Sequence, residues 1–269
     1  MIRCCDNIDF LEFLLKENYS IDLVITDPPY NIGKDFGNDS DKQEMDSYIS
    51  NLKIRFAKVS QLLKEHGSVI CFSSHLYVAH IQIMLQEFLQ YRRMMIWYYK
   101  NGMSRQTNTP VTEYEPFLWF TKSNNWIYNT DDIRVPYKTD RVKSPIYKTN
   151  VKGEKIAWMP NPRGAKRGDV WEYPTLAGKL YENEKTEHPT QKPESLITDL
   201  IKAFCPKKND IYEGNVLDIY GGSGTTAVCC EQLNQQGHNI NYFSCEIEPK
   251  WVNITINRLK TISKNYFLF

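Results

Sequence analysis

A glycine-rich loop between a strand-like and a helix-like segment constrains the fold of this chain most. Residues Val216–Tyr220 read as a buried strand, and Thr225–Leu233 reads as a helix. Between them Gly222 and Gly224, followed by Ala227, satisfy the pattern G-x-G-x-x-A. Glycines at these places let the backbone turn tightly and approach a ligand closely. The pattern predicts a strand–loop–helix unit that receives a nucleotide-like cofactor.

An acidic residue stands where such a unit needs one. Glu246 ends the strand-like run Tyr242–Glu246, nineteen residues after Ala227. A carboxylate at that strand end can accept hydrogen bonds from both hydroxyls of a ribose. No Gly-Lys-Ser/Thr follows the loop, which excludes a Walker-type phosphate loop. Binders of dinucleotides and of S-adenosylmethionine share this pattern, and the pattern alone leaves both open.

Strand-like and helix-like segments alternate along most of the 269 residues. Such alternation predicts an α/β protein with a doubly wound, mostly parallel sheet. The apolar fraction of 41% is that of a globular domain, and no apolar run is long enough to span a membrane. We expect strands at Ile21–Thr26, Ser68–Phe72, Met94–Tyr99, Pro116–Phe120, Val216–Tyr220 and Tyr242–Glu246. We expect helices at Met45–Lys64, Pro193–Phe204, Thr225–Leu233 and Trp251–Ile262, with Pro193 at the first helical position.

A basic segment interrupts this alternation. Between Ile133 and Gly168 ten Lys and Arg residues stand against two acidic ones, a net charge of +8 in a chain whose total is +1. The segment also carries Tyr137, Tyr147 and Trp158, and it lacks helical periodicity. Basic residues interleaved with aromatic ones are typical of nucleic-acid-binding surfaces. We expect a loop-rich insert that binds nucleic acid, against the plainer interpretation of a solvated charged face.

The segment Thr26–Tyr30 follows directly on an apolar strand and reads Thr-Asp-Pro-Pro-Tyr. Its prolines fix φ and lack backbone N–H groups, while their carbonyls are left free to accept hydrogen bonds. Asp27 adds a carboxylate acceptor, and Tyr30 adds a flat aromatic face. Two acceptors can hold both hydrogens of an amino group while the aromatic ring stacks on the bound ring. The segment predicts a site for a planar ring with an exocyclic amine, formed by Asp27, Pro28, Pro29 and Tyr30.

Three motifs in a fixed order resemble those of the amino-directed DNA methyltransferases. They are Asp27-Pro-Pro-Tyr30, His188-Pro-Thr-Gln-Lys-Pro193 and the Asp-x-x-x-Gly-Ser-Gly-Thr-Thr loop at 218–226. The catalytic motif comes first, the basic segment second and the cofactor loop last, which is the circularly permuted order of the β class. Segments 134–137, 160–162 and 168–171 are similar to the MboII-like adenine-N6 methyltransferases of restriction–modification systems. The resemblance covers about residues 3–260 and implies the Rossmann-like fold of S-adenosylmethionine-dependent methyltransferases.

The resemblance implies S-adenosylmethionine as methyl donor and S-adenosylhomocysteine as product. Lys192 would pair with the carboxylate of the methionine part, Glu246 would hold the ribose, and Asp6 would lie near the adenine ring. The family usually has Phe where this chain has Tyr220, for which we expect a small effect. The residues that the resemblance places at the cofactor are Asp6, Asp27, His188, Thr190, Gln191, Lys192, Pro193, Asp218, Tyr220, Gly222, Ser223, Gly224, Thr225, Thr226 and Glu246. No zinc-type ligand cluster is present, and we expect no metal in the reaction.

The resemblance also implies double-stranded DNA as the substrate, with an adenine flipped out of the duplex. Asp rather than Ser before Pro-Pro-Tyr favours adenine-N6 over cytosine-N4, which stays the alternative. The chain then divides into a catalytic part (1–130), a target-recognition insert (131–185) and a cofactor-binding part (186–269). The side chains expected to contact DNA are Lys34, Arg134, Lys138, Arg141, Lys143, Arg163, Lys166 and Arg167. Loop Asn31–Asp46 is either a lid over the flipped base or a plain surface loop.

Other classes of protein share parts of these patterns. An RNA or protein-amide methyltransferase leaves the basic segment less well explained. A nicotinamide-dependent oxidoreductase would explain the glycine loop but would give the Asp-Pro-Pro-Tyr segment no function. A DNA-binding protein without activity would be expected to have lost one of the two loops, and both are intact. Seven cysteines without a Cys-x-x-Cys pair, behind an N-terminus unlike a secretory signal, predict a reduced cytoplasmic protein that acts on the nucleoid. A homodimer and a partner restriction endonuclease stay open.

Overall fold

The computed structural model describes residues 1–36, 41–102, 107–140 and 145–263, and its centre is a nine-stranded sheet. The strand order is β1-β11-β10-β2-β3-β5-β4-β8, with β9 beside β10. Neighbours from β1 to β3 are parallel, β5 is antiparallel to β3 and β4, and β8 is parallel to β4. The strands are β1 (Ile2–Cys4), β2 (Ile21–Thr26), β3 (Leu63–Phe72), β4 (Gln90–Tyr98), β5 (Tyr114–Thr121), β8 (Val170–Glu172), β9 (Lys207–Lys208), β10 (Ile211–Asp218) and β11 (Asn239–Glu246).

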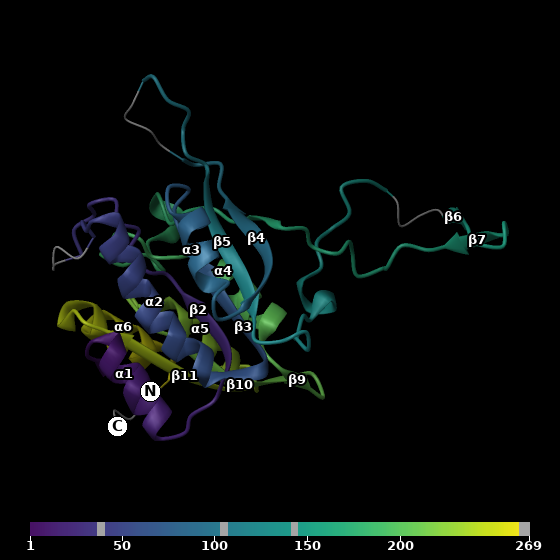
Figure 1. The fold of residues 1–269 in the computed structure, drawn as a ribbon. Coiled ribbons are helices and arrows are strands. Elements are labelled where there is room, and N and C mark those ends of the chain that lie inside the picture. The colour runs from purple at the N-terminus through teal and green to yellow at the C-terminus, as the bar shows by residue number, and fades with distance from the viewer. Residues whose placement is uncertain (37–40, 103–106, 141–144, 264–269) are drawn as a thin grey trace.

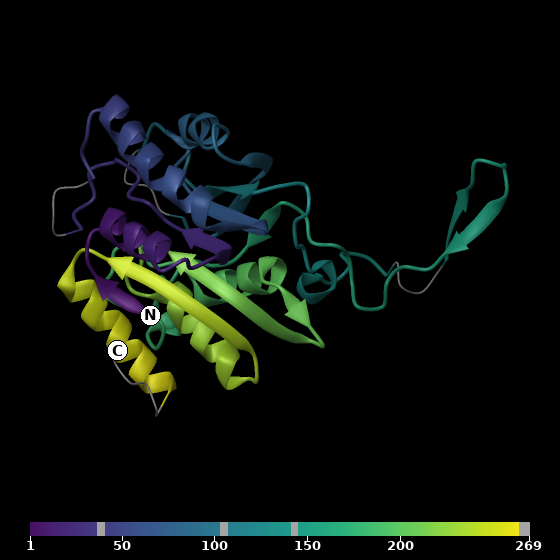
Figure 2. The ribbon, with the colours of Figure 1, turned by 60° about the horizontal axis from the view of Figure 1, so that its bottom comes forward.

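Helices cover both faces of this sheet (Figures 1 and 2). One face carries α1 (Asn7–Lys16), α2 (Met45–Leu62) and α3 (Val78–Leu85); the other carries α4 (Glu194–Phe204) and α5 (Thr225–Gln235), with α6 (Pro249–Ile262) against α5. Strand β2 is buried along its whole length, as a parallel strand covered on both faces should be. The apolar stripe of α4 is buried in the hydrophobic core between this helix and the sheet.

The chain leaves two central strands in opposite directions. From β10 it passes through α5 to β11 on one side, and from β2 it passes through α2 to β3 on the other. The loops after β2 and β10 therefore diverge, and ligands of open α/β sheets bind in the crevice that such a switch point leaves. The predicted doubly wound, mostly parallel sheet is confirmed, and the two aromatic strands predicted as a pair are antiparallel neighbours, β4 and β5.

The basic segment leaves the body as an extended arm (Figures 1 and 2). Its tip is a hairpin of β6 (Ile146–Thr149) and β7 (Lys155–Trp158), which form a small antiparallel sheet of their own. The short 3-10 helices η1 (Thr130–Ile133) and η3 (Lys179–Tyr181) lie near the two ends of the predicted insert. Directly after the basic segment, strand β8 joins the main sheet beside β4 and buries Trp171. This pairing anchors the end of the arm to the body.

The structure adds elements that the sequence patterns did not predict, namely β1, α1, α3, β8, β9 and the hairpin inside the expected loop region. Helix α1 begins after Asp6, whose carboxylate accepts a hydrogen bond from the Ile8 N–H (2.7 Å), a standard N-cap. The placement of Pro193 at the first helical position was wrong: α4 begins at Glu194 and Pro193 is its N-cap. Within the described residues, no helix has the length and apolar character needed to cross a membrane.

Candidate active site

A cavity of about 260 Å³ opens at the carboxyl ends of β2 and β10, at the switch point of the sheet. Asp27 follows β2, Asp218 ends β10 and Glu246 ends β11, so carboxylates from three strands face it. The glycine loop forms one wall, and His188–Lys192 forms another. The catalytic and cofactor loops expected from the sequence, far apart along the chain, thus share one cavity.

The loop Asp27–Tyr30 presents acceptors to this cavity. The Pro29 carbonyl accepts a hydrogen bond from the Tyr48 hydroxyl (2.8 Å), which fixes the loop against α2. Asp27 Oδ2 lies 2.5 Å from the Lys192 ammonium, whereas Asp27 Oδ1 is buried and no described residue hydrogen-bonds to it. Leaving a buried acceptor unsatisfied costs about 1–3 kcal/mol. This oxygen is therefore available to a donor on a bound molecule.

Lys192 is a buried cation between two carboxylates. Its ammonium lies 2.5 Å from Asp27 and 3.1 Å from Glu115. It also donates to the Tyr30 hydroxyl (3.2 Å), which in turn donates to Glu115 (2.8 Å), and three aromatic rings surround it. Burial lowers the pKa of Lys192, but the two carboxylates outweigh burial and raise it, so the side chain stays charged. The ammonium predicted at the cofactor is bonded to the catalytic loop.

The cofactor loop needs glycine at two positions. Gly222 (φ 49°) and Gly224 (φ 77°) adopt the left-handed conformation that other residues disfavour. A Cβ on Gly222 would come within 2.9 Å of His188 Nε2, and a Cβ on Gly224 within 2.3 Å of Thr255. Helix α5 begins at Thr225, directly after the loop, so its first turn carries free N–H groups toward a ligand. The backbone here forms a cradle that a side chain would fill.

A buried carboxylate, Asp218, and a half-buried one, Glu246, brace this loop. Burial raises the pKa of Asp218 to about 7, although hydrogen bonds from the Thr226 hydroxyl (2.8 Å) and the Tyr220 N–H (3.1 Å) favour its charged form. Burial also raises the pKa of Glu246, whose Oε2 accepts a hydrogen bond from the Gly222 N–H (2.9 Å). Asp218 thereby holds the loop to the start of α5, and Glu246 holds it to the neighbouring strand.

Aromatic residues close the cavity beside α6. The His188 ring meets the Trp251 ring edge-on with centroids 4.8 Å apart, and Trp251 Nε1 donates to the Phe36 carbonyl (3.1 Å). Burial, with smaller contributions from nearby cations, lowers the pKa of His188 to about 4. The ring is therefore neutral near pH 7 and adds no positive charge to the cavity.

The loop after Tyr30 is folded against the body over its described residues. Asp41 is buried, and its carboxylate accepts hydrogen bonds from the backbone N–H groups of Asn31, Ile32 and Lys34. Lys34, predicted as a DNA contact, lies on the cavity wall. Residues 37–40 are outside the described part of the chain. Trp251 Nε1 also donates to the Phe36 carbonyl, so the described part of the loop borders the cavity.

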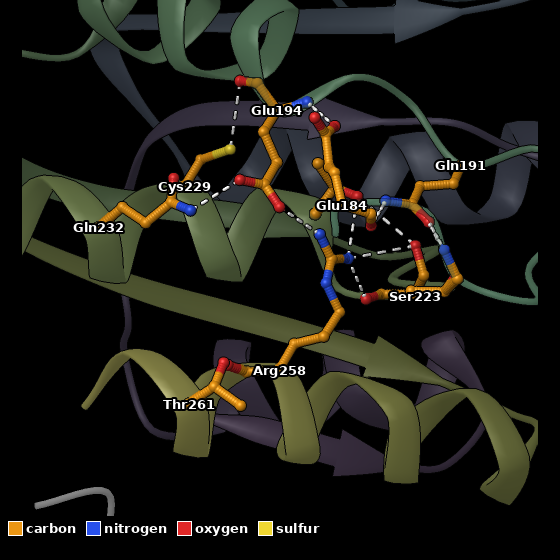
Figure 3. A network of polar contacts seen from close by, with 10 residues as sticks. Glu184, Gln191, Glu194, Ser223, Cys229, Gln232, Arg258 and Thr261 are labelled. Atoms are coloured by element: carbon orange, nitrogen blue, oxygen red, sulfur yellow. Dashed lines mark hydrogen bonds and ion pairs between the residues drawn. The ribbon is translucent and has the colours of Figure 1, made fainter. Parts of the chain in front are cut away.

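A network of polar contacts ties the glycine loop to the start of α4 (Figure 3). Arg258 of α6 donates to the Ser223 carbonyl (2.6 Å) and pairs with Glu194 (2.7 Å). The Glu194 N–H donates to the Glu184 carboxylate (2.7 Å), and the Gln191 amide donates to the Glu184 carbonyl (2.8 Å). The side-chain amide of Gln191, which was predicted to contact the cofactor, thus forms hydrogen bonds within the protein. The network therefore connects the two walls of the cavity, the glycine loop and the segment that contains Gln191.

Most of the predicted site residues do line the cavity. These are Asp6, Asp27, Pro28, Pro29, Tyr30, His188, Thr190, Gln191, Lys192, Asp218, Tyr220, Gly222, Ser223, Thr225, Thr226 and Glu246. Gly224 and Pro193 are absent from the wall as described: Gly224 packs against Thr255 and Pro193 caps α4. Asp6 lines the cavity and caps α1 at once.

Other cavity residues were not predicted from the sequence. Asn7 and Arg55 face the cavity from α1 and α2, and Trp251 was expected only as part of an apolar helix stripe. Glu115 pairs with Lys192 next to the cavity, although its position just before the expected strand Pro116–Phe120 gave it no role. A carboxylate in so apolar a strand was a usable signal, because buried charges are rare unless paired.

The basic residues predicted at DNA fall into groups with different surroundings. Arg134 pairs with Asp131 (2.6 Å). Arg167 pairs with Asp199 (2.9 Å) and donates to the Tyr173 hydroxyl (2.8 Å). Both arginines are mostly buried, so their guanidinium groups hold the base of the insert together.

The remaining predicted contacts are more open to solvent. Lys138 and Lys166 are exposed, and Arg163 is largely exposed although it pairs with Asp131. Arg141 and Lys143 lie outside the described residues. The hairpin adds Lys148, Lys152 and Lys155, all exposed, which the basic segment contained but the prediction did not single out.

The strand order and the cavity at the switch point define the fold of S-adenosylmethionine-dependent methyltransferases. The solved structure of the M1.HpyAVI–SAM complex matches with a TM-score of 0.66 over 96% of this chain and 98% of that one, at 22% identity. The cytosine-N4-specific PvuII DNA methyltransferase matches with a TM-score of 0.67 over 99% and 87%, at 16% identity. These likenesses confirm the predicted fold.

A model of the DNA methylase family matches residues 21–257, and the chain belongs to this N6/N4 family. The chain is 34% identical over 253 residues to the type II methyltransferase M1.MboII of Moraxella bovis, covering 91% of this chain and 90% of that protein. It is 29% identical over 248 residues to the DNA adenine methyltransferase YhdJ of Escherichia coli, covering 91% and 78%. The protein is therefore a DNA methyltransferase, and the predicted family is confirmed.

The cofactor of this family, S-adenosylmethionine, fits the residues that are present. The loop from Gly222 to Gly224 is a cradle closed to side chains, and Glu246 lies beside it at the end of the next strand. The neutral His188 ring leaves room for a sulfonium cation without charge repulsion. Among the described residues no group of three or more His, Cys, Asp or Glu side chains could hold a metal ion.

Proposed function

We propose that this protein is a site-specific DNA adenine-N6 methyltransferase and the modification enzyme of a type II restriction–modification system. When bound, S-adenosylmethionine supplies a methyl group activated by its sulfonium. The observation that carries the proposal is the buried, unpaired Oδ1 of Asp27 on the wall of the cavity next to the cofactor loop. The likeness to the DNA adenine methyltransferase YhdJ supports adenine as the target, and the likeness to the type II methyltransferase M1.MboII supports the type II setting.

The acceptors after β2 suit an exocyclic amine. Asp27 Oδ1 and the Pro28 carbonyl accept its two hydrogens and draw the nitrogen toward tetrahedral geometry, so that its lone pair is freed from the ring. The Pro29 carbonyl is engaged by Tyr48, which leaves the Pro28 carbonyl for the base. Asp27 then receives the proton that the methylated amine releases. Acceptors fixed before the substrate arrives supply most of the acceleration.

The Tyr30 side chain is held for stacking. Its hydroxyl donates to Glu115 (2.8 Å) and accepts a hydrogen bond from Lys192 (3.2 Å), so the ring cannot rotate freely. A flipped base loses its neighbours in the duplex, which costs a few kcal/mol, and stacking on a fixed aromatic ring offsets part of this cost.

The remaining cavity residues divide the cofactor between them. The backbone from Gly222 to Gly224 supports it, Glu246 accepts from the ribose hydroxyls, and Asp6 lies toward the adenine end. His188 and Thr190 close over the methionine end. Because Lys192 is bonded to Asp27 and Glu115, we assign it to the catalytic loop, and the methionine carboxylate is left to backbone N–H groups around the cradle.

The arm carries the double-stranded DNA substrate in this proposal. A two-stranded ribbon is narrow enough to enter the major groove. The hairpin presents Lys148, Lys152 and Lys155 for phosphates, and Tyr147 and Trp158 are exposed for contacts to sugars and bases. Lys138, Lys166 and Arg163 extend this surface toward the body, and Arg134 and Arg167 hold its base.

The proposal is tested by incubating the protein with labelled S-adenosylmethionine and unmethylated genomic DNA, followed by mass spectrometry of the nucleosides. N6-methyladenine is the expected product. N4-methylcytosine would reverse the choice of base while keeping the chemistry; this second candidate draws support from the shared fold of the cytosine-N4-specific PvuII enzyme. Absence of methyl transfer by protein that binds the cofactor would overturn the proposal.

A further inference from the structure

One carboxylate beside the cavity, Glu115, contacts both Tyr30 and Lys192. Glu115 lies at the start of β5, opposite Trp97 of β4. Its Oε2 accepts the hydrogen bond of the Tyr30 hydroxyl (2.8 Å) and pairs with the Lys192 ammonium (3.1 Å). It is not part of the cavity wall, so a bound base or cofactor would meet Lys192 and Tyr30 before it.

The arrangement leaves the Lys192 ammonium shared between two anions. Asp27 Oδ2 and Glu115 Oε2 take it at 2.5 and 3.1 Å, while Asp27 Oδ1 has no hydrogen-bond partner among the described residues. An ammonium carries three N–H donors on a flexible stem. Without the second anion, the donor that now points to Glu115 would be open to Oδ1, the other oxygen of the same Asp27 carboxylate, which has no hydrogen-bond partner among the described residues. Glu115 competes with Asp27 for the cation.

We infer that Glu115 is a positioning residue that keeps Asp27 Oδ1 free for the amino group of the target base. The inference rests on the proposed function, because that function assigns the amine to this oxygen. Glu115 acts through Lys192, which it draws away from Oδ1. It touches neither the base nor the cofactor.

The first test replaces the carboxylate by an amide of the same shape. In Glu115→Gln we expect kcat to fall about tenfold, because misplacing one acceptor weakens the alignment of the amine. The Kd for S-adenosylmethionine and the KM for DNA change less than twofold. Glu115→Asp keeps the charge and restores kcat to within about threefold of wild type; it also serves if the Gln variant fails to fold.

The matched control is Glu12→Gln, which removes the charge from the surface pair of Lys58 and Glu12 (2.9 Å). It should leave kcat unchanged. If Glu115 only stabilises the fold, Glu115→Gln lowers Tm and leaves kcat at the wild-type value, and the inference is wrong.

A double-mutant cycle separates action through Asp27 from an independent effect. In an Asp27→Asn background, measured by single-turnover transfer of labelled methyl, Glu115→Gln should lower the rate by less than twofold. A further tenfold loss in that background would contradict the inference, since Glu115 would then act elsewhere.

A crystal structure of Glu115→Gln decides the geometry without any activity. We expect Lys192 Nζ within hydrogen-bonding distance of both Asp27 oxygens. A Lys192 that stays on Oδ2 alone would overturn the inference. Wild-type protein that transfers no methyl group to DNA would overturn the proposed function instead, and the crystal structure would still give its own answer about Glu115.

Discussion

The cavity and the arm of this molecule are built in opposite ways. The cations that hold the catalytic loop and the cofactor loop are largely buried and paired: the Lys192 side chain is 6% exposed and that of Arg258 is 14% exposed. Along the arm every residue of β7 is exposed, and so are the hairpin lysines. Buried partners fix a charge before the ligand arrives, whereas exposed charges are free to follow a polyanion. In the proposed function, the chemistry therefore takes place at the rigid sheet edge, and the DNA contacts are made by the exposed arm.

The largest effect should come from removing the acceptor of the cavity. Asp27→Ala should lower kcat by about a hundredfold or more, since the amine loses a preorganised charged contact. The Kd for S-adenosylmethionine should change less than threefold, because the cradle lies on β10 and α5. Single-turnover transfer and calorimetric binding check the two halves. Asp169→Asn, which breaks an exposed pair with Arg93, is the control. Near-normal turnover of Asp27→Ala with cofactor bound would refute the assigned chemistry.

The arm should respond in the reverse manner. Replacing Lys148, Lys152 and Lys155 together by Ala should weaken DNA binding about ten- to thirtyfold and leave the affinity for S-adenosylmethionine unchanged. The slope of log K against log[salt] should fall by about 3, since each phosphate contact contributes about 0.9. Fluorescence titration of labelled duplex between low and moderate salt measures both.

The control for the arm is a second triple variant. Lys16, Lys208 and Lys260 are exposed lysines of the body, and their replacement by Ala removes the same total charge. If both triple variants lose the same affinity and slope, net charge rather than the hairpin governs DNA binding, and the contrast between cavity and arm fails.

The sequence predicted the cavity better than the contacts that hold it. Gly222, Gly224 and Glu246 could be predicted because backbone conformation and strand ends demand particular residue types at fixed spacings. Asp27 to Tyr30 could be predicted because an acidic residue followed by two prolines and a tyrosine places hydrogen-bond acceptors beside an aromatic ring. Few sites other than one for an amine on a planar ring need this combination. These signals are local, so one sequence displays them.

Pairings between distant segments leave no such signal. Nothing near Lys192 in the sequence indicates that its partners are Asp27 and Glu115, because the three meet only when α4, β2 and β5 pack. The same holds for Arg134 and Arg167, which looked like free cations in a basic run and are paired with Asp131 and Asp199. The hairpin was missed for another reason: its strands are exposed on both faces and lack the alternation that marks a half-buried strand.

A smaller effect distinguishes the two ends of the cavity. Arg258→Gln removes the pair with Glu194 and weakens the hold on the Ser223 carbonyl, so the cradle loses support. We expect the Kd for S-adenosylmethionine to rise about fivefold and kcat at saturating cofactor to change less than twofold. This is the opposite split to that of Glu115→Gln. Arg93→Gln is the control at an exposed pair, and a fall in kcat alone would show that Arg258 serves the catalytic end.

The last effect concerns stability rather than activity. Burial raises the pKa of Asp218 to about 7, against about 3.9 in an unfolded chain, so the folded cofactor-free protein binds this proton more tightly. The stability from Asp218 is then fully present below about pH 4 and is lost as pH rises through 7.

Urea unfolding from pH 5 to pH 8 should show wild type losing free energy of unfolding relative to Asp218→Asn. The loss should be on the order of 2–3 kcal/mol, because each pH unit between 5 and the folded pKa contributes about 1.36 kcal/mol. His188, with its pKa near 4, is present in both proteins and cancels in the difference. Parallel curves for the two proteins would mean that Asp218 is ionised in the empty cavity, which would then be far more polar than its burial implies.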